Sequence, residues 1–431
     1  MVDLKAIYLT ALAQCAPVEV MKRFRISGFR SPGGAPAVVA IGKCAVGMVQ
    51  GLAPAGEVFI AVPEGYAGAP RGHDGTYGRD ETDGSADLTI GPIGPIGPIV
   101  SHSVHQGGHP QITPASFAAG RALLAFVDRQ ENIIFLISGG GSACVEVPLP
   151  PFTEHEITDT NRRLIDAGLP IREINTVRKR LSAIKGGKLA ARVRGRAITL
   201  LYSDVSAGAL SDIASGPTLP DDTTLDEAIH ILRRIDCDHI VTKLRDQMAL
   251  PVVGYAESHL LADNGTLTAA AAKLVEEAGG IAVRWEGQLE GDVEATAAAL
   301  AARTATLREG EVLIAGGEPT VVKTGTGRGG RCSELALRFI RQLSAQRSTD
   351  KGQPATDNAF QALFASSDGV DGNSGAAGIF LPRLPGTHDG DEIARALAGS
   401  DSYTIAAQVG EPIMIAPTGN NLRDLFLMAR G

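Results

Sequence analysis

The chain has few of the features of a secreted, membrane-spanning or nucleic-acid-binding protein. Its five cysteines are scattered, odd in number and free of CxxC spacing, which argues against a disulfide framework and a zinc site. No apolar run approaches the roughly 18 residues of a membrane span, and the N-terminus has no signal-peptide core. The formal net charge is −8 and no basic stripe is present. We therefore expect a cytoplasmic protein with no membrane or nucleic-acid partner.

Aromatic residues are also scarce, at 4% of the chain, whereas glycine is abundant with 52 residues. This composition favours close packing of helices on sheets over a β-sandwich. A length of 431 residues predicts two or three domains. Short apolar runs of the buried-strand type alternate with helical stretches, which is typical of βαβ units on mainly parallel sheets. The strands are expected at 38–41, 58–62, 133–137, 198–202, 281–285, 312–315 and 363–365.

Helix signals and the domain boundary follow from local patterns. Thr113-Pro114 predicts an N-cap and first helical residue for a helix that runs to about Arg129. Asn264 is expected to cap a second helix, 267–277. We place the boundary in or just after the helical stretch 221–255, which divides the chain into domains of residues 1–245 and 246–431. The Gly-Pro-Ile repeat at 91–99 predicts an extended loop with no catalytic role.

The most informative motif is a glycine loop, Ser138-Gly139-Gly140-Gly141-Ser142, which follows an apolar strand. Glycines let backbone N–H groups turn inward, and α/β sheets bind ligands at the carboxyl ends of their strands. The loop therefore predicts a phosphate site. A second element, Gly316-Gly317-Glu318, follows the strand expected at 312–315. Two similar loops predict a ligand held between two domains.

Cationic residues accompany these loops. Lys43 follows the first strand and is expected in the first turn of a helix. The segment 175–187 carries Arg178, Ser182 and Lys185 on one predicted helical face, although such charge runs are more often solvated surfaces. Arg331 follows a run of glycines and lies beside a helix expected from about Ser333, which makes an anion site by dipole and by bidentate geometry.

Two acidic residues follow expected strands. Asp204, at the tip of the strand 198–202, could hold Mg²⁺ or accept a proton from a substrate hydroxyl, and could equally cap a helix. Asp368 opens an Asp-Gly-Val-Asp-Gly motif, for which a tight turn is the simpler interpretation. The sequence lacks the Walker A, protein-kinase, nucleophile-elbow and dinucleotide fingerprints, which weakens those classes.

Taken in order, these motifs resemble the class II glycerate 2-kinases, whose C-terminal region is known as the MOFRL domain. The similarity runs from about residue 5 to 428 and includes Gly42-Lys43, His109-Pro110, the two glycine elements, Ser203-Asp204-Val205, 213–218 and Pro417-Thr418-Gly419. The resemblance implies a two-domain α/β fold, with a Rossmann-like N-terminal domain on a mainly parallel sheet and a smaller α/β MOFRL domain. It also implies ATP and glycerate as ligands in the cleft between the domains, and 2-phosphoglycerate as the product.

The resemblance also implies roles for individual residues. Lys43 and Arg331 match the active-site lysine and arginine, and Asp204 matches the aspartate of the Ser-Asp-Val motif. Phosphoryl transfer needs positive charge around the transferred group and in-line placement of the hydroxyl, which two cations from separate domains can supply. The remaining candidate residues are the nucleotide-binding loops Ser138 to Ser142 and Gly316 to Glu318, the substrate-binding Asn175, Arg178, Ser182 and Lys185, and the metal ligands Asp204 and Asp368.

This chain departs from the family's usual motifs at several ligand-facing positions. Ser206-Ala207-Gly208-Ala209 follows Val205 where a second acidic residue is usual, and Cys332-Ser333 replaces Asn-Gln after Arg331. The Asp-Gly-x-Asp-Gly motif continues as Asn373-Ser374-Gly375 instead of Pro-Thr-Asp. These changes bear on the metal site and on which acid the pocket accepts.

The leading hypothesis is an ATP- and Mg²⁺-dependent kinase for the 2-hydroxyl of D-glycerate or a related short sugar acid. One alternative is a hydroxypyruvate reductase, which the missing dinucleotide fingerprint disfavours. Another is a degenerate sugar-acid-binding protein on a kinase scaffold, which the altered motifs motivate. A phosphosugar isomerase is the weakest alternative. A homodimer is left open as the oligomeric state.

Overall fold

The computed structural model describes residues 2–24, 34–66, 102–205, 208–246, 254–349, 360–383 and 390–430. These residues form two compact units. The N-terminal unit contains the described residues from Pro17 to Asp263, and the C-terminal unit contains those up to Ala16 and from Asn264 onward. The repeat at 91–99 lies outside the described residues. The domains predicted at 1–245 and 246–431 stay a prediction.

The N-terminal unit is built on a parallel sheet of six strands in the order β3-β2-β1-β4-β5-β6. The central strands are apolar and buried along their whole length, as expected for a sheet covered on both faces. All four strands expected in this part of the chain are present. The bounds are β1 Ala37–Ile41, β2 Val58–Pro63, β3 His102–Gly107, β4 Ile133–Ser138, β5 Ala197–Tyr202 and β6 Glu257–Ala262.

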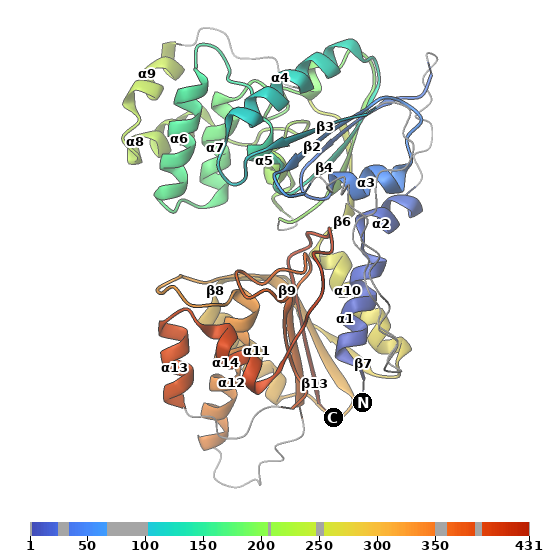
Figure 1. Cartoon of the computed structure of the whole chain (residues 1–431), viewed down its shortest axis with the longest axis vertical. Helices are drawn as coiled ribbons and strands as arrows, with labels where there is room; N and C mark the ends of the chain where they lie inside the picture. The colour runs from blue at the N-terminus through green and yellow to red at the C-terminus, as the bar shows by residue number, and fades with distance from the viewer. Residues whose placement is uncertain are drawn as a thin grey trace, which may run out of the picture. The chain divides into compact units, whose positions relative to one another are not determined.

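Helices pack around this sheet, and a group of them lies together beside it (green to yellow-green in Figure 1): Glu154–Asp166, Ile171–Leu181, Leu225–Arg234 and Asp238–Asp246. Helix α4 starts at Pro114 and ends at Arg129, which confirms the predicted proline start. The helices are α2 Pro17–Arg23, α3 Ala45–Leu52, α4 Pro114–Arg129, α5 Gly141–Cys144, α6 Glu154–Asp166, α7 Ile171–Leu181, α8 Leu225–Arg234 and α9 Asp238–Asp246, with 3-10 turns η1 Ala190–Arg192 and η2 Leu210–Ser215.

The C-terminal unit has a mixed sheet in the order β12-β11-β10-β13-β9-β7, with β8 also paired to β9. The expected mainly parallel arrangement is wrong here, because the pairs β9–β13, β13–β10, β10–β11 and β11–β12 are antiparallel. Only β7 and β8 pair with β9 in parallel. The bounds are β7 Ile281–Arg284, β8 Leu289–Asp292, β9 Glu311–Thr320, β10 Phe360–Ser366, β11 Gly378–Leu381, β12 Glu411–Pro412 and β13 Asp424–Arg430.

Helices from both ends of the chain belong to this second unit. The first helix, α1, packs against α10, and the buried Tyr8 hydroxyl donates to the carbonyl of Ser366 at 2.7 Å. The predicted capping role of Asn264 is wrong, because this residue begins α10 and its side-chain amide donates to the carbonyls of Leu422 and Asp424. The helices are α1 Leu4–Gln14, α10 Asn264–Glu277, α11 Val293–Ala305, α12 Arg331–Thr349, α13 Gly390–Ala398 and α14 Ser402–Val409.

Candidate active site

The carboxyl ends of β1 and β4 lie side by side and are joined by hydrogen bonds. The backbone N–H of Lys43 donates to the carbonyl of Gly139 at 2.9 Å, and the N–H of Cys44 donates to Oγ of Ser138 at 3.0 Å. Gly140 has a φ of 77°, and a Cβ at this position would lie 2.9 Å from Cγ of Lys43. The glycine therefore lets the lysine side chain lie directly on the loop. Lys43 itself lies in the turn before α3 and not in the helix, a difference of two residues from the prediction.

Asp204 lies over the same loop from the end of β5. A Cβ on Gly139 would lie 1.7 Å from Oδ2 of Asp204, so this glycine is required for the carboxylate to occupy its position. Lys43 and Asp204 thus flank the Gly139-Gly140 turn from two neighbouring strands. This edge of the sheet brings a cation and a carboxylate together around a backbone turn, which is an arrangement suited to phosphate and to a metal-bound phosphate.

A second part of the site is formed by α7 and the end of η2. The buried Arg178 guanidinium donates through Nη1 to Oγ of Ser142 at 3.1 Å and through Nε to Asn161 at 2.8 Å. Oγ of Ser142 lies 2.5 Å from Oγ of Ser215, which donates to Oδ1 of Asn175 at 2.7 Å. Burial lowers the pKa of Arg178 to about 10, so it stays a cation at neutral pH.

His109, which follows β3, belongs to the same electrostatic environment. Partial desolvation, together with the charges of Lys43 and Arg178, lowers its pKa to about 4. The imidazole is therefore neutral at neutral pH. The cations at this edge of the sheet consequently come from Lys43 and Arg178, and not from the histidine.

Ser182 and Lys185, the other two candidates of the basic segment, do not share the hydrogen-bond partners of Arg178. Helix α7 ends at Leu181, so the predicted helical face shared by Arg178, Ser182 and Lys185 is wrong. Ser182 and Lys185 instead both bind the buried carboxylate of Glu146, Ser182 through its hydroxyl at 2.5 Å and Lys185 through its ammonium. This ion pair is fully enclosed, and a substrate-binding role for Lys185 and Ser182 stays a prediction. The simpler interpretation of the segment as a solvated surface is also wrong for the buried Arg178, Lys179 and Lys185.

In the C-terminal unit, Arg331 begins α12 and is held by two carboxylates. Its Nη1 donates to Glu318 at 2.7 Å, and its Nε and Nη2 donate to Asp424 at 3.2 Å each. Burial acts to lower the pKa of Arg331, but Asp424 and Glu318 raise it above its ordinary value. About a third of the Arg331 side chain remains exposed, at 36%. The guanidinium is thus a cation that two carboxylates hold in place, on a side chain that is partly accessible.

The second glycine element is not a loop. Gly316 and Gly317 lie inside β9, where they pair with Leu425 and Asp424 of β13. A Cβ on Gly316 would lie 2.1 Å from Oδ1 of Asn264, and one on Gly317 would lie 2.0 Å from the carbonyl oxygen of Leu289. The loop prediction is wrong because these glycines serve close approach of neighbouring backbone and side chains. A nucleotide-binding role for Gly316, Gly317 and Glu318 stays a prediction.

The acidic motif after β10 forms local structure around the start of α12. Asp371 accepts from the backbone N–H groups of Cys332 and Ser333 at 2.9 Å each and so caps the helix that Arg331 begins. Asp368 accepts from the hydroxyl of Ser366 and the N–H of Val370, which is the tight turn of the simpler interpretation. Among the described residues no three His, Cys, Asp or Glu side chains form a metal-binding cluster. Metal ligation by Asp204 and Asp368 stays a prediction.

Three residues that bind predicted site residues are not indicated by the sequence patterns. Glu146, Ser215 and Asp424 each bind a predicted site residue through a hydrogen bond. Ser215 lies in the motif 213–218, one of the segments that carry the family resemblance. Asp424 directly precedes the apolar run Leu425–Ala429, a strand signal that would have marked it as a residue at a strand start. Glu146 has no comparable local signal.

The fold and these residues define a two-unit α/β protein with a phosphate-type glycine turn at the carboxyl edge of a parallel sheet and a carboxylate-held arginine in a second unit. Two family descriptions match the chain: "Domain of unknown function (DUF4147)" over residues 3–249 and "MOFRL family" over residues 311–424. Together with the relatives below, these matches show that the chain belongs to the class II glycerate 2-kinase family, in agreement with the sequence resemblance.

Individual relatives agree with this assignment. The glycerate 2-kinase of Sulfurisphaera tokodaii is 30% identical over 79% of this chain and 83% of its own. A protein of Agrobacterium vitis that is provisionally named hydroxypyruvate reductase is 32% identical over 74% of this chain and 75% of its own. The crystal structure of glycerate kinase from Thermotoga maritima covers 99% of both chains with a TM-score of 0.76 and 26% identity.

Proposed function

We propose that this protein is a glycerate 2-kinase, which transfers the γ-phosphoryl group of ATP to the 2-hydroxyl of D-glycerate or of a closely related short sugar acid. The observation that carries the proposal is the position of Lys43 and Asp204 on either side of the Gly139-Gly140 turn in a member of this family. The relatives named as glycerate 2-kinases and the Thermotoga maritima glycerate kinase structure support the substrate class.

In the proposed reaction, the 2-hydroxyl oxygen forms a bond to the γ-phosphorus while the bond to the β–γ bridging oxygen breaks, and ADP leaves. The hydroxyl proton passes to a base or to solvent. Lys43 binds the transferred phosphoryl group, and Arg331 neutralises charge that develops on it, because phosphoryl transfer depends mainly on positioning and on electrostatic stabilisation. That the two cations meet on one nucleotide is part of the proposal.

Arg178 is the proposed partner of the substrate carboxylate. It is a buried cation, and its Nη1 reaches the glycine loop through Ser142. An arginine can hold a carboxylate through two parallel hydrogen bonds. A substrate carboxylate would compete with the Ser142 hydroxyl for Nη1 of Arg178. Because the carboxylate is charged and the hydroxyl is neutral, the carboxylate is the stronger acceptor.

Mg²⁺ fits the donor set at Asp204. The ion usually binds proteins through one or two carboxylates and fills its remaining positions with water and substrate phosphates. A single carboxylate beside a phosphate-type turn therefore suffices, and bound Mg²⁺ would neutralise charge on the ATP phosphates. Asp204 either holds the metal or orients the hydroxyl. Asp204→Asn separates these roles, because a metal ligand raises the Mg²⁺ concentration needed for half-maximal rate, whereas an orienting group lowers kcat at saturating Mg²⁺.

The experiment that tests the function is a coupled ATP-consumption screen across three- and four-carbon hydroxy acids. The expected result is turnover with D-glycerate or a close relative, with the phosphate ester located at the 2-position by phosphorus NMR. Reactions without acid and without enzyme are the controls. Absence of ATP consumption with every acid, in Mg²⁺ and in Mn²⁺, would remove the kinase assignment and favour a sugar-acid-binding protein.

A hydroxypyruvate reductase is the second candidate, favoured by the name of the Agrobacterium vitis relative. The chain has no dinucleotide fingerprint at the strand-to-helix turns of the parallel sheet. NADH or NADPH oxidation with hydroxypyruvate as the only other substrate, in the absence of coupling enzymes, would decide for the reductase. Under the kinase proposal no oxidation is expected.

We further propose that the protein acts in the cytoplasm. The scattered cysteines, all free and buried, suit a reducing compartment. Among the described residues, no helix has the length and apolarity that crossing a bilayer requires. A homodimer also stays a prediction, which sedimentation of the purified chain would test.

A further inference from the structure

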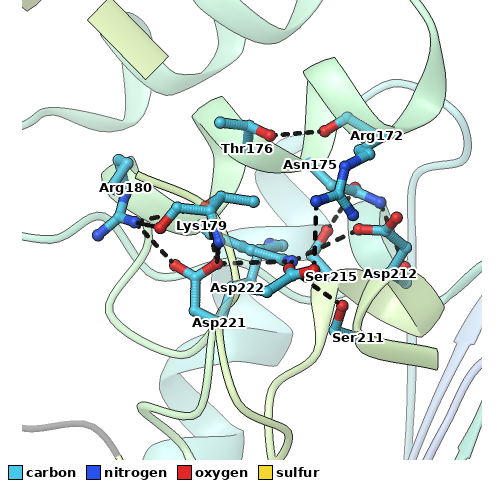
Figure 2. Close-up of polar contacts among 12 residues, drawn as sticks. Arg172, Asn175, Thr176, Lys179, Arg180, Ser211, Asp212, Ser215, Asp221 and Asp222 are labelled. Carbon is cyan, nitrogen blue, oxygen red and sulfur yellow. Dashed lines mark hydrogen bonds and ion pairs between the residues drawn. The ribbon is translucent and has the colours of Figure 1, made fainter. Parts of the chain in front are cut away.

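The buried Lys179 ammonium lies close to three carboxylates in the N-terminal unit, of which Asp212 is buried and Asp222 is exposed. Its side chain is fully buried on α7, with Asp212 at 3.4 Å, Asp221 at 3.6 Å and Asp222 at 3.8 Å from its Nζ (Figure 2). Its Nζ makes no hydrogen bond to any residue that the structure describes. A buried charge requires compensation, so the attraction of these carboxylates must hold the lysine in place.

Of the three carboxylates, Asp212 depends most on Lys179. Asp221 also binds the backbone and hydroxyl of Thr223, and Asp222 binds Arg172 at 3.2 Å. Asp212 is buried, and its Oδ1 has no hydrogen-bond partner within the described parts of the chain. Oδ1 of Asp212 therefore relies on the Lys179 charge, whereas Lys179 also faces Asp221 and Asp222.

Asp212 is the first residue of a strained turn, residues 212–216. Ala214 and Ser215 have φ values of 51° and 61°, followed by Gly216 at 59°. Left-handed backbone costs free energy at each non-glycine residue and persists only where the surroundings enforce it. Two such residues in succession require stabilising contacts from their surroundings. The Lys179–Asp212 ion pair supplies one such contact at the start of the turn.

The strained turn packs onto the glycine loop. Oγ of Ser215 lies 2.5 Å from Oγ of Ser142, and a Cβ on Gly141 would lie 2.9 Å from Cβ of Ala214. Asn175, one helical turn before Lys179 on α7, ties the arrangement together: its Oδ1 accepts from Ser215 at 2.7 Å, and its Nδ2 donates to the Asp212 carbonyl at 3.2 Å (Figure 2). The turn thus connects Lys179 to the glycine loop through Asp212 and Ser215.

We propose that Lys179 is a positioning residue for phosphoryl transfer: its buried charge anchors Asp212, so that the strained turn 212–216 holds Ser142 and the glycine loop in the geometry that the reaction needs. The proposal rests on the proposed kinase function. Lys179 does not touch the ligand in this account. It acts on the rate because a displacement of about 1 Å in a positioning group can cost roughly a hundredfold in rate.

Three variants and one control test this role. Lys179→Met removes the charge with little loss of volume, and Asp212→Asn weakens the same pair while keeping the backbone carbonyl that Asn175 binds. Ala214→Gly relieves left-handed strain, because glycine adopts this conformation without a Cβ penalty. The control is Lys243→Met, which breaks a lysine–carboxylate pair with Glu156 on the surface of the helices beside the sheet.

The expected result is a drop in kcat of about tenfold to a hundredfold for Lys179→Met, with KM for ATP and for the acid changed by less than about threefold. Asp212→Asn should follow in the same direction with a smaller effect, and Lys243→Met should retain wild-type kcat. In the Ala214→Gly background the loss caused by Lys179→Met should shrink by at least about threefold, since a turn without strain needs less anchoring.

A merely structural lysine would give another pattern. If Lys179→Met and Asp212→Asn lower the melting temperature but leave kcat unchanged at a temperature where both are folded, the proposal is overturned. Loss of kcat that Ala214→Gly does not reduce would equally overturn it, because the effect would then not pass through the strained turn.

Amide hydrogen exchange separates this proposal from the proposed function. Exchange of the peptide spanning residues 209–219 should be faster in Lys179→Met than in wild type and unchanged in Lys243→Met, whatever reaction the protein catalyses. If wild-type protein consumes no ATP, the kinase assignment fails, and exchange alone then decides whether Lys179 holds the turn. Unchanged exchange in Lys179→Met would overturn the anchoring role.

Discussion

Both carboxylate oxygens of the fully buried Asp424 face the guanidinium of Arg331, with Oδ2 accepting from Nε and Oδ1 from Nη2 at 3.2 Å each. This bidentate pair fixes the plane of the guanidinium and leaves Nη1 to Glu318. If Arg331 neutralises charge in the transition state, an incoming phosphate competes for Nη1 with the half-exposed Glu318. Asp424 then fixes the orientation of the Arg331 guanidinium.

Asp424→Asn should therefore lower kcat by about tenfold to a hundredfold, since the amide presents N–H groups to a guanidinium that has only donors. Steady-state kinetics with saturating ATP and acid would measure the loss. Asp292→Asn is the matched control, because Asp292 caps α11 in the same unit and asparagine is an equally good cap. Equal kcat in Asp424→Asn and wild type would show that Arg331 needs no orientation by this carboxylate.

The same aspartate predicts a pH dependence of stability. Burial raises the pKa of Asp424 from 3.8 to about 6, although Arg331 opposes the shift. Between about pH 4 and 6 the folded unit therefore binds a proton that the unfolded chain has lost, so the free energy of unfolding falls as pH rises. The shift of about two units corresponds to roughly 3 kcal/mol across this window.

Urea unfolding of wild type and Asp424→Asn at pH 4.5 and pH 6.5 would measure this contribution. Trp285 is the chain's one tryptophan and packs against the core of the C-terminal unit, so its fluorescence reports on that unit. The fall in stability with rising pH should be smaller in Asp424→Asn than in wild type. Identical pH dependences in the two proteins would contradict the raised pKa.

The sequence predicts this fold best where structure is local. Lys43, the Ser138–Ser142 loop and Asp204 each follow an apolar strand in the sequence. Their proximity is predictable because the carboxyl ends of parallel strands meet at one edge of the sheet. The C-terminal sheet was harder, since β13 enters between β9 and β10 from the end of the chain. Nothing near Gly316 and Gly317 indicates that strand pairing continues through them.

Side-chain partners were beyond local reasoning for a related reason. The spacing of Arg178, Ser182 and Lys185 matches a helix, but α7 ends at Leu181 and the chain then turns toward Glu146. Whether a cation faces ligand or an internal carboxylate depends on residues 36 to 39 positions apart, as with Ser182 and Lys185 against Glu146. No period in the sequence encodes that distance.

Removal of either proposed catalytic cation should abolish most of the turnover. Lys43→Ala and Arg331→Ala are each expected to lower kcat by about 10³-fold or more, the magnitude that a transition-state cation can contribute in phosphoryl transfer. Lys273→Ala, which removes an exposed lysine on α10, serves as the control. Near-normal turnover in Lys43→Ala or Arg331→Ala would remove the assigned role of that residue.

The close approach of Asp204 to the glycine loop predicts the effect of adding a single methyl group. In Gly139→Ala the new Cβ would overlap Oδ2 of Asp204, which it would approach to 1.7 Å, so the carboxylate has to move. We expect a loss of kcat of about a hundredfold together with an altered Mg²⁺ dependence. Gly390→Ala is the control, since a Cβ there meets nothing within 4 Å. A Gly139→Ala enzyme with wild-type kinetics would show that the position of Asp204 is unimportant for the reaction.

The strand location of Gly316 predicts a different result for Gly316→Ala. Its Cβ would lie 2.1 Å from Oδ1 of Asn264, whose amide donates to the carbonyls of Leu422 at 2.7 Å and Asp424 at 3.0 Å. Displacing Asn264 would break these buried hydrogen bonds, so the free energy of unfolding should fall by about 1–3 kcal/mol. Urea unfolding followed by Trp285 fluorescence would measure the loss, with Gly390→Ala as control. The KM for ATP, measured where the variant is folded, should change by less than about threefold. A large rise in KM with an unchanged urea midpoint would instead place Gly316 at the nucleotide, because a phosphate contact affects binding without supporting the sheet.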